Sequence, residues 1–145
     1  MNRSIGLACR CVSNLVKRKM CESEAVRESQ QLTGMHGFVI KYIYEHQGED
    51  VYQRDLEKRF EIRRSTATQM LSLMEKNGLI LRQPVSHDAR LKRLVLTPKA
   101  VALHKNVEKE IKGIEESLMQ GISVEEMEIF FAVIDKVKAN LTAKE

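Results

Sequence analysis

The sequence has little of what several protein classes need. It has no tryptophan, only two prolines in 145 residues, and aromatic residues make up 5%. Because β-sandwich strands usually draw on aromatic and β-branched residues, this scarcity favours helices. No apolar run approaches the roughly 18 residues that cross a bilayer, and the N-terminal apolar stretch, residues 5–9, is too short for a secretory signal. We therefore expect a cytoplasmic protein with no membrane partner.

Cysteine is also scarce and unevenly placed. The three cysteines, Cys9, Cys11 and Cys21, all lie within the first 21 residues. An odd, clustered set does not form the disulfide framework of a small secreted domain, so we expect free thiols. Cys9 and Cys11 would point about 200° apart on a helix, so any disulfide requires a second subunit or a rearrangement. Redox sensing by these cysteines remains a hypothesis beside a simple packing role.

What the chain does have is charge concentrated in its middle third. The composition is 43% hydrophobic and 30% charged, which argues against intrinsic disorder. The net charge of +4 is uneven: residues 51–100 carry a net +6, and residues 101–145 a net −3. A compact basic segment indicates a polyanionic partner for that segment alone, although a solvated basic face would look the same.

Apolar residues recur at spacings of three and four in several stretches, which is typical of helices with one buried face. Ser4 is placed to cap the first helix, Thr97 and Pro98 open a later one, and Ser123 with Glu126 forms a capping box for the last. The expected helices span residues 4–21, 33–46, 53–60, 65–76, 98–119 and 123–141.

The third and fourth of these helices are short and separated by only a few residues, which predicts a helix-turn-helix. Asn77-Gly78 supplies a left-handed stop for the second of them. Residues 79–85 and 91–96 then predict two strands, and the polar residues 86–90 between them predict a hairpin tip. A basic hairpin directly behind a helix-turn-helix is a wing. Residues 50–52 are a further short strand candidate.

The predicted fold is mainly α with a small β-wing, a winged helix-turn-helix flanked by N- and C-terminal dimerisation helices. Residues 1–31 would form the N-terminal helix and linker, residues 32–100 the DNA-binding domain, and residues 101–145 the C-terminal dimerisation helices. The terminal helices carry apolar stripes that so small a core cannot cover. We therefore expect a homodimer, with packing inside one chain as the alternative.

The start of the helix over residues 65–76 carries the expected base contacts. The N-terminal half of a helix in the major groove reaches the base edges, and short polar side chains there allow close approach. Thr68 suits a thymine methyl and Gln69 an adenine, whereas exposed polar residues on any helix would look similar. The predicted recognition residues are Arg63, Arg64, Ser65, Thr66, Thr68 and Gln69.

The wing adds a second contact. A narrow minor groove attracts an inserted arginine, and Arg90 near the hairpin tip suits that insertion. Asp88 is placed to orient Arg90, and Lys92 and Arg93 to hold flanking phosphates. The alternative for Asp88 and Arg90 is an ordinary surface ion pair of little energetic weight.

In these features the chain resembles the MarR-type winged-helix transcriptional regulators over nearly its whole length. The resemblance is strongest in residues 55–60, in residues 65–80, and in the wing pattern Asp88-x-Arg90…Leu96-Thr97. It implies an obligate homodimer that binds a palindromic operator in double-stranded DNA, usually as a repressor. It also implies release by a small phenolic or lipophilic effector, a metal or cysteine oxidation, and it makes Arg90 the minor-groove arginine. Ala89, Arg63 and Gly37 depart from the family pattern.

Other readings of the sequence compete with this one. His104 and Glu108 lie four residues apart on one helix face, with His36, Glu22 and Cys21 as further metal ligands, but an ordinary surface histidine is preferred. The chain lacks a phosphate-binding glycine loop and a nucleophile elbow, so we expect neither an enzyme nor a bound cofactor. A winged-helix protein-interaction module without specific DNA binding would not need Arg90. The sequence therefore predicts a homodimeric, sequence-specific DNA-binding regulator, a repressor released by a small-molecule or oxidative signal.

Overall fold

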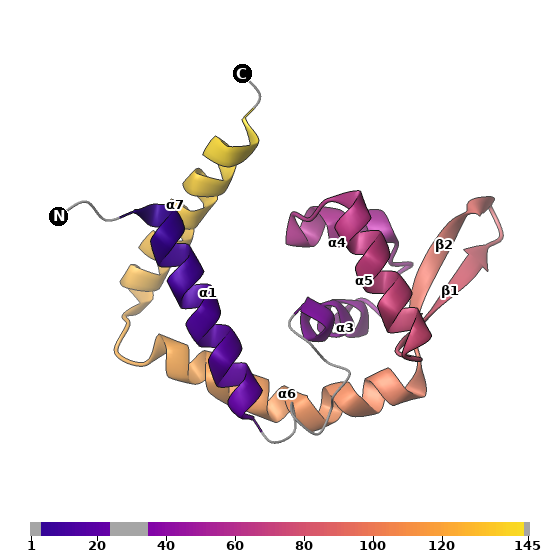
Figure 1. Cartoon of the computed structure of the whole chain (residues 1–145), viewed down its shortest axis with the longest axis horizontal. Helices are drawn as coiled ribbons and strands as arrows, with labels where there is room; N and C mark the ends of the chain where they lie inside the picture. Colours follow the sequence, from indigo (N-terminus) through magenta and orange to yellow (C-terminus); the bar gives the residue numbers. More distant parts are fainter. Residues whose placement is uncertain (1–3, 24–34, 144–145) are drawn as a thin grey trace. The chain divides into compact units, whose positions relative to one another are not determined.

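The computed structural model describes residues 4–23 and 35–143, and within these ranges it contains six helices and one two-stranded sheet (Figure 1). The mainly helical fold with a small β-wing is the one that the sequence predicts. The chain divides into two compact units, one ending at Ile111 and the other beginning at Lys112. The elements are α1 (Ile5–Glu22), α3 (Met35–Glu45), α4 (Gln53–Phe60), α5 (Arg64–Lys76), β1 (Ile80–Val85), β2 (Asp88–Leu96), α6 (Pro98–Met119) and α7 (Val124–Thr142).

Most predicted helix bounds are confirmed to within two residues. The expected start of α3 at Thr33 lies outside the described residues, as does most of the linker expected after the first helix. No helix in the described part of the chain combines the length and the apolar character that a bilayer crossing needs.

A single apolar core organises the first unit. On α5 the core residues Ala67, Leu71 and Met74 are fully buried at spacings of four and three, which is the spacing of one helix face, and Met70 packs partly buried beside them. Their burial removes apolar surface from water and fixes which face of α5 remains outside. The core is completed from α3, α4, the hairpin, α6 and the segment before α4; its other members are Val39, Ile40, Ile43, Val51, Leu56, Leu79, Ile80, Leu94, Ala100 and Val107.

α4 and α5 form the predicted helix-turn-helix. The Asp55 carboxylate accepts a hydrogen bond from the Tyr52 amide at 2.8 Å, which satisfies a free donor at the start of α4. Glu61 ends α4 in a left-handed conformation at φ 51°, and the Ile62 amide donates back to the Glu57 carbonyl at 3.1 Å. α5 then begins at Arg64, one residue before the predicted start.

α5 ends at a glycine stop that also supports the start of α6. Gly78 adopts φ 69°, and the Leu79 amide donates to the Met74 carbonyl at 2.9 Å, which is a Schellman arrangement. The Thr97 hydroxyl donates to the Gly78 carbonyl at 2.6 Å and accepts from the Ala100 amide at 3.2 Å. The predicted cap of α6 therefore also satisfies a carbonyl at the end of α5.

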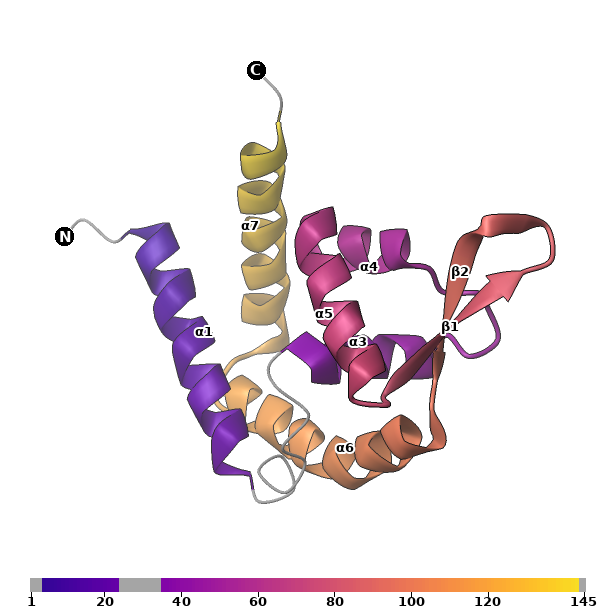
Figure 2. The ribbon, with the colours of Figure 1, turned by 45° about the vertical axis from the view of Figure 1, so that its right-hand side comes forward.

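The hairpin differs from its prediction at the tip. β1 pairs with β2 in antiparallel register from Ile80 opposite Leu96 to Pro84 opposite Lys92, and then shifts so that Val85 faces Asp88. The expected five-residue tip over 86–90 was wrong, because Asp88, Ala89 and Arg90 already belong to β2. The extra residues of β2 are accommodated as a bulge. The hairpin projects away from α4 and α5 in both ribbon views (Figure 1 and Figure 2).

The short strand expected over residues 50–52 is reduced to one bridge. Tyr52 pairs with Arg93, and the Leu94 amide donates to the Val51 carbonyl at 2.7 Å. These contacts attach the segment before α4 to the base of the wing.

The terminal helices have their predicted caps and carry no buried residue. The Ser4 hydroxyl accepts from the Leu7 amide at 3.3 Å at the start of α1. Ser123 and Glu126 form the capping box of α7, after Gly121 at φ 78°. Neither α1 nor α7 buries a side chain among its described residues, so both leave their apolar stripes exposed.

We expect Gly78→Ala to lower the free energy of unfolding by about 1 kcal/mol, because a side chain is strained at this positive φ. Gly113→Ala is a matched control, since Gly113 lies inside α6 and an added Cβ would meet nothing within 4 Å. This control should stabilise the protein slightly, because alanine favours helices more than glycine does. Urea unfolding measures the change in the free energy of unfolding of each variant relative to the wild-type protein. Equal changes of the same sign in the two variants would contradict the role of Gly78.

Candidate nucleic-acid interface

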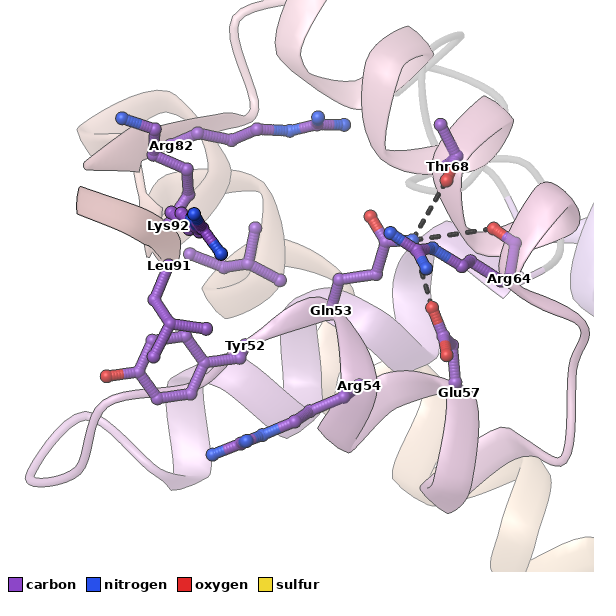
Figure 3. A pocket seen from close by; sticks show the side chains of 11 residues that line it. Tyr52, Gln53, Arg54, Glu57, Arg64, Thr68, Arg82, Leu91 and Lys92 are labelled. Atoms are coloured by element: carbon purple, nitrogen blue, oxygen red, sulfur yellow. Dashed lines mark hydrogen bonds between the residues drawn. The ribbon is translucent and has the colours of Figure 1, made fainter. Parts of the chain in front are cut away.

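A basic groove lies between α4, the start of α5 and the wing. Its volume is about 460 Å³, and Figure 3 shows side chains from all three elements around it. Glu57 is the only acidic side chain among its lining residues. Since like charges so close together repel one another, such a surface favours a polyanion. The cationic lining residues are Arg54, Arg64, Arg82, Arg90 and Lys92.

The predicted recognition residues all lie exposed at the start of α5. Arg63 occupies the N-cap, and its side chain makes no capping hydrogen bond. The first amides of α5 therefore have no side-chain cap. They lie at the positive end of the helix dipole, where phosphate binds readily. Of the predicted set, Arg64 and Thr68 line the groove. The exposed residues are Arg63, Arg64, Ser65, Thr66, Thr68 and Gln69.

Gln53, the first residue of α4, links the two helices of the helix-turn-helix and was missed by the sequence analysis. Its amide nitrogen donates to Glu57 Oε1 and to Thr68 Oγ1, both at 2.9 Å, and lies 3.4 Å from the Arg64 carbonyl oxygen (Figure 3). The i, i+4 spacing of Gln53 and Glu57 was available in the sequence. The bond to Thr68, fifteen residues away, depends on how α4 and α5 pack.

In the wing, Asp88 acts on the main chain of Arg90. Its carboxylate accepts from the Arg90 amide at 2.9 Å, which holds the backbone of the bulge. The Arg90 side chain lines the groove. Among the interactions of the described residues there is no Asp88–Arg90 ion pair, so Asp88 does not neutralise the Arg90 guanidinium.

Lys92 and Arg93 lie on opposite faces of β2, because successive side chains of a strand alternate. Lys92 lines the groove. Arg93 instead pairs with Asp50 at 3.2 Å and donates to Gln83 Oε1 at 3.0 and 3.2 Å. The structure therefore does not bring the two predicted phosphate-binding residues together. Arg93 fastens the wing to the segment before α4.

Two groove arginines were also missed by the sequence analysis. Arg82 reaches the groove from β1, where it donates to Ser72 Oγ at 3.3 Å and pairs with Glu75 at 3.6 Å. Arg54 lies over the ring of Tyr52, with its guanidinium 5.3 Å from the ring centroid. The alternation of β1 and the position of Arg54 in the first turn of α4 were the available signals.

Tyr52 remains a neutral phenol at the edge of the groove. Burial, followed by the Asp50 carboxylate, raises the pKa of Tyr52, and the nearby Arg54 and Arg93 oppose this shift only in part. Its hydroxyl lies 3.4 Å from Asp50 Oδ2, the same residue that pairs with Arg93.

The other predicted sites lie elsewhere. Cys9, Cys11 and Cys21 are free and exposed on α1. His104 was expected as a surface histidine, which was wrong: it is buried, and its ring packs against Tyr44 at a centroid distance of 4.5 Å. Among the described residues, no group of three or more His, Cys, Asp or Glu side chains could hold a metal ion.

The helix-turn-helix, the basic hairpin and the groove between them define a winged-helix protein. The family profile described as MarR family matches residues 30–91. The transcription regulator MarR from Oenococcus oeni PSU-1 is 27% identical with a TM-score of 0.73, and the match covers 92% of this chain and 94% of that one. The chain is therefore similar to the MarR family of winged-helix transcriptional regulators, in sequence over residues 30–91 and in fold over most of its length.

Two further solved structures share the fold. MepR from S. aureus, solved as a complex with DNA, is 24% identical with a TM-score of 0.83, covering 96% of this chain and 99% of that one. The heme sensor PefR from Streptococcus agalactiae, solved with heme, is 26% identical with a TM-score of 0.63, covering 97% and 95%. The match to almost the full length of each shows that the shared fold includes the terminal helices of this chain.

Because Lys92 and Arg93 lie on opposite faces of β2, we expect their substitution to affect DNA binding and stability differently. Lys92→Met should weaken duplex binding and reduce the slope of log affinity against log salt by about 1, because one phosphate contact is lost. Arg93→Met should leave that slope unchanged, and should lower the free energy of unfolding by up to about 1 kcal/mol because the exposed pair with Asp50 is broken. Binding titrations at several salt concentrations, with urea unfolding, measure both effects. A reduced salt slope for Arg93→Met would contradict this assignment.

Proposed function

We propose that this protein is a homodimeric repressor that binds a palindromic operator in double-stranded DNA and releases it on a chemical signal. The observation that carries the proposal is the groove in which five cationic side chains surround the start of α5 beside the wing. Such a regulator works in the compartment that holds the DNA, in keeping with the expected cytoplasmic location.

The groove supports a docking in which α5 enters the major groove and the wing follows the backbone. The exposed Ser65, Thr66 and Gln69 would then face base edges, and the uncapped amides of α5 would face phosphate. Arg90 would enter the adjacent minor groove, where a narrow groove attracts an unpaired guanidinium. MepR, a protein of the same fold that was solved as a complex with DNA, supports DNA as the ligand of this surface.

The terminal helices support the dimer. α1 exposes Ile5, Leu7, Val12 and Leu15, and α7 exposes a larger set that includes both phenylalanines of its second and third turns. Soluble monomers rarely leave apolar side chains exposed along whole helices. We propose that residues 1–31 and 101–145 form the dimer interface and that residues 32–100 bind DNA. The exposed apolar residues of α7 are Val124, Ile129, Phe130, Phe131, Val133 and Leu141.

Two kinds of signal fit the proposal. The exposed thiols Cys9, Cys11 and Cys21 are accessible to oxidants, and a small lipophilic or phenolic effector is the other candidate. PefR, described as a heme sensor, supports a bound small molecule as a signal in this fold. Release by peroxide that is lost when all three cysteines become Ser would favour oxidation, and release by a phenolic compound would favour an effector.

Selection from a random duplex library tests the DNA-binding proposal directly. The wild-type protein should enrich a palindrome with half-sites about one helical turn apart. Arg90→Ala should bind the enriched site at least tenfold more weakly with its unfolding transition unchanged, because Arg90 is exposed and lines the groove. Salt-sensitive binding without any enriched sequence would indicate nonspecific binding. No binding at all would favour a protein-interaction module.

The dimer proposal predicts that polar substitutions on α7 separate the subunits. The rings of Phe130 and Phe131 contact edge to face at 5.4 Å, and both side chains are more than half exposed. The double variant Phe130→Ser, Phe131→Ser should sediment as a monomer at concentrations where the wild-type protein sediments as a dimer, and it should lose operator binding. The exposed Lys136→Ser on the same helix is the control. Wild-type protein that sediments as a monomer with an intact helical spectrum would overturn the proposal.

A further inference from the structure

The hydrogen bonds inside the basic groove converge on one side chain that has no assigned role. Gln53 is partly buried at the start of α4. Its amide nitrogen is 2.9 Å from both Glu57 Oε1 and Thr68 Oγ1, and the dashed lines of Figure 3 meet at this nitrogen. Gln53 therefore connects a carboxylate on its own helix to a hydroxyl on the outer face of the recognition helix α5.

Glu57 decides which end of the Gln53 amide faces α5. An ionised carboxylate only accepts hydrogen bonds, so the amide nitrogen, and not the amide oxygen, must be directed at it. The network around a glutamine amide is what distinguishes its nitrogen from its oxygen. With the nitrogen held by Glu57, the same nitrogen is presented to Thr68, and the Gln53 oxygen points away from both partners (Figure 3).

The bond from Gln53 sets the polarity of the Thr68 hydroxyl. Thr68 Oγ1 accepts from Gln53, so its own hydrogen cannot point at Gln53. Thr68 is exposed and lines the groove, and no side chain in the described part of the protein accepts this hydrogen. A hydroxyl that already receives a hydrogen bond becomes a better donor, because neighbouring hydrogen bonds polarise one another. Thr68 thus offers a donor to whatever occupies the groove.

We propose that Glu57 and Gln53 position the Thr68 hydroxyl as a donor, so that Thr68 selects a keto base, guanine or thymine, in the major groove. Guanine O6 and thymine O4 accept hydrogen bonds there, whereas cytosine N4 only donates and adenine presents an N6 donor beside N7. The inference rests on the proposed function, since it requires α5 to lie in the major groove. It makes Gln53 a positioning residue for specificity, acting through Thr68.

The test uses full-length protein and the operator enriched by the wild-type chain, with each base of one half-site varied in turn. One position should show about a fivefold preference for a keto base, the size expected of a single hydrogen bond. Thr68→Val removes the hydroxyl at nearly constant volume and should abolish the preference at that position alone. Gln53→Met removes the side-chain amide and should reduce the keto-base preference below about twofold. The salt dependence of binding should stay unchanged. Glu57→Gln frees the amide to turn either way and should give an intermediate value.

A double-variant cycle separates positioning from general damage. If Gln53 acts through Thr68, Gln53→Met should have no further effect on this base preference when Thr68 is already Val. Gln47→Met makes the same chemical change at an exposed glutamine outside the groove and should leave the preference intact. If Gln53→Met disturbs folding, the near-isosteric Glu57→Gln variant tests the same positioning role.

The outcomes distinguish this inference from the function on which it rests. If the wild-type chain enriches an operator but no keto preference depends on Thr68, the inference is wrong and the proposed function stands. A preference that depends on Thr68 but is unchanged in both Gln53→Met and Glu57→Gln also overturns it, because the hydroxyl then needs no positioning. If no sequence is enriched at all, both proposals fail.

Discussion

The burial of one face of α5 is the constraint on which the rest of the molecule depends. Ala67, Leu71 and Met74 have no exposed surface, and a rotation of α5 would bring them out of the core. Each large apolar side chain exposed in this way costs about 1.5–3 kcal/mol. The burial of these residues therefore fixes the face of α5 on which Thr68 and Gln69 lie. A precise recognition surface requires this kind of support from behind.

The concentrated positive charge of the groove destabilises the folded protein. Its cations converge from α4, α5 and both strands of the wing, and Glu57 is the only carboxylate that lines it. Like charges held together destabilise the compact state and are relieved when an anion binds. Some of the basic side chains around the wing are restrained from inside the protein, Arg82 by Glu75 and Arg93 by Asp50. The charges that stay available are those nearest the start of α5 and the bulge of β2.

Local features of the fold could be predicted from the sequence, because the relevant interactions lie within a few residues. Capping by Ser4 and Ser123 follows from side chains next to the helix ends, and the stop at Gly78 from the φ that only glycine adopts easily. The spacing of three and four residues between apolar side chains indicated that α5 has one buried face.

Features that depend on contacts between distant segments could not be predicted in the same way. Arg93 pairs with Asp50, 43 residues away, and so serves the wing and not the groove. Gln53 meets Thr68 only because α4 and α5 pack together. The sequence indicated a surface histidine at His104, but the ring of Tyr44 packs against it and the side chain is buried. The bulge at Arg90 depends on the strand register, which alternation alone does not fix.

The Thr97 hydroxyl has a mechanical consequence, because it serves two helix ends at once. It donates to the carbonyl of Gly78, where α5 stops, and accepts from the amide of Ala100, where α6 begins. The Lys99 ammonium adds a bond to the Asn77 carbonyl at 3.0 Å. A change in the angle between α5 and the first turns of α6 would break these bonds together. The two helix ends therefore form a rigid joint, and the recognition helix inherits its orientation from the N-terminal part of α6.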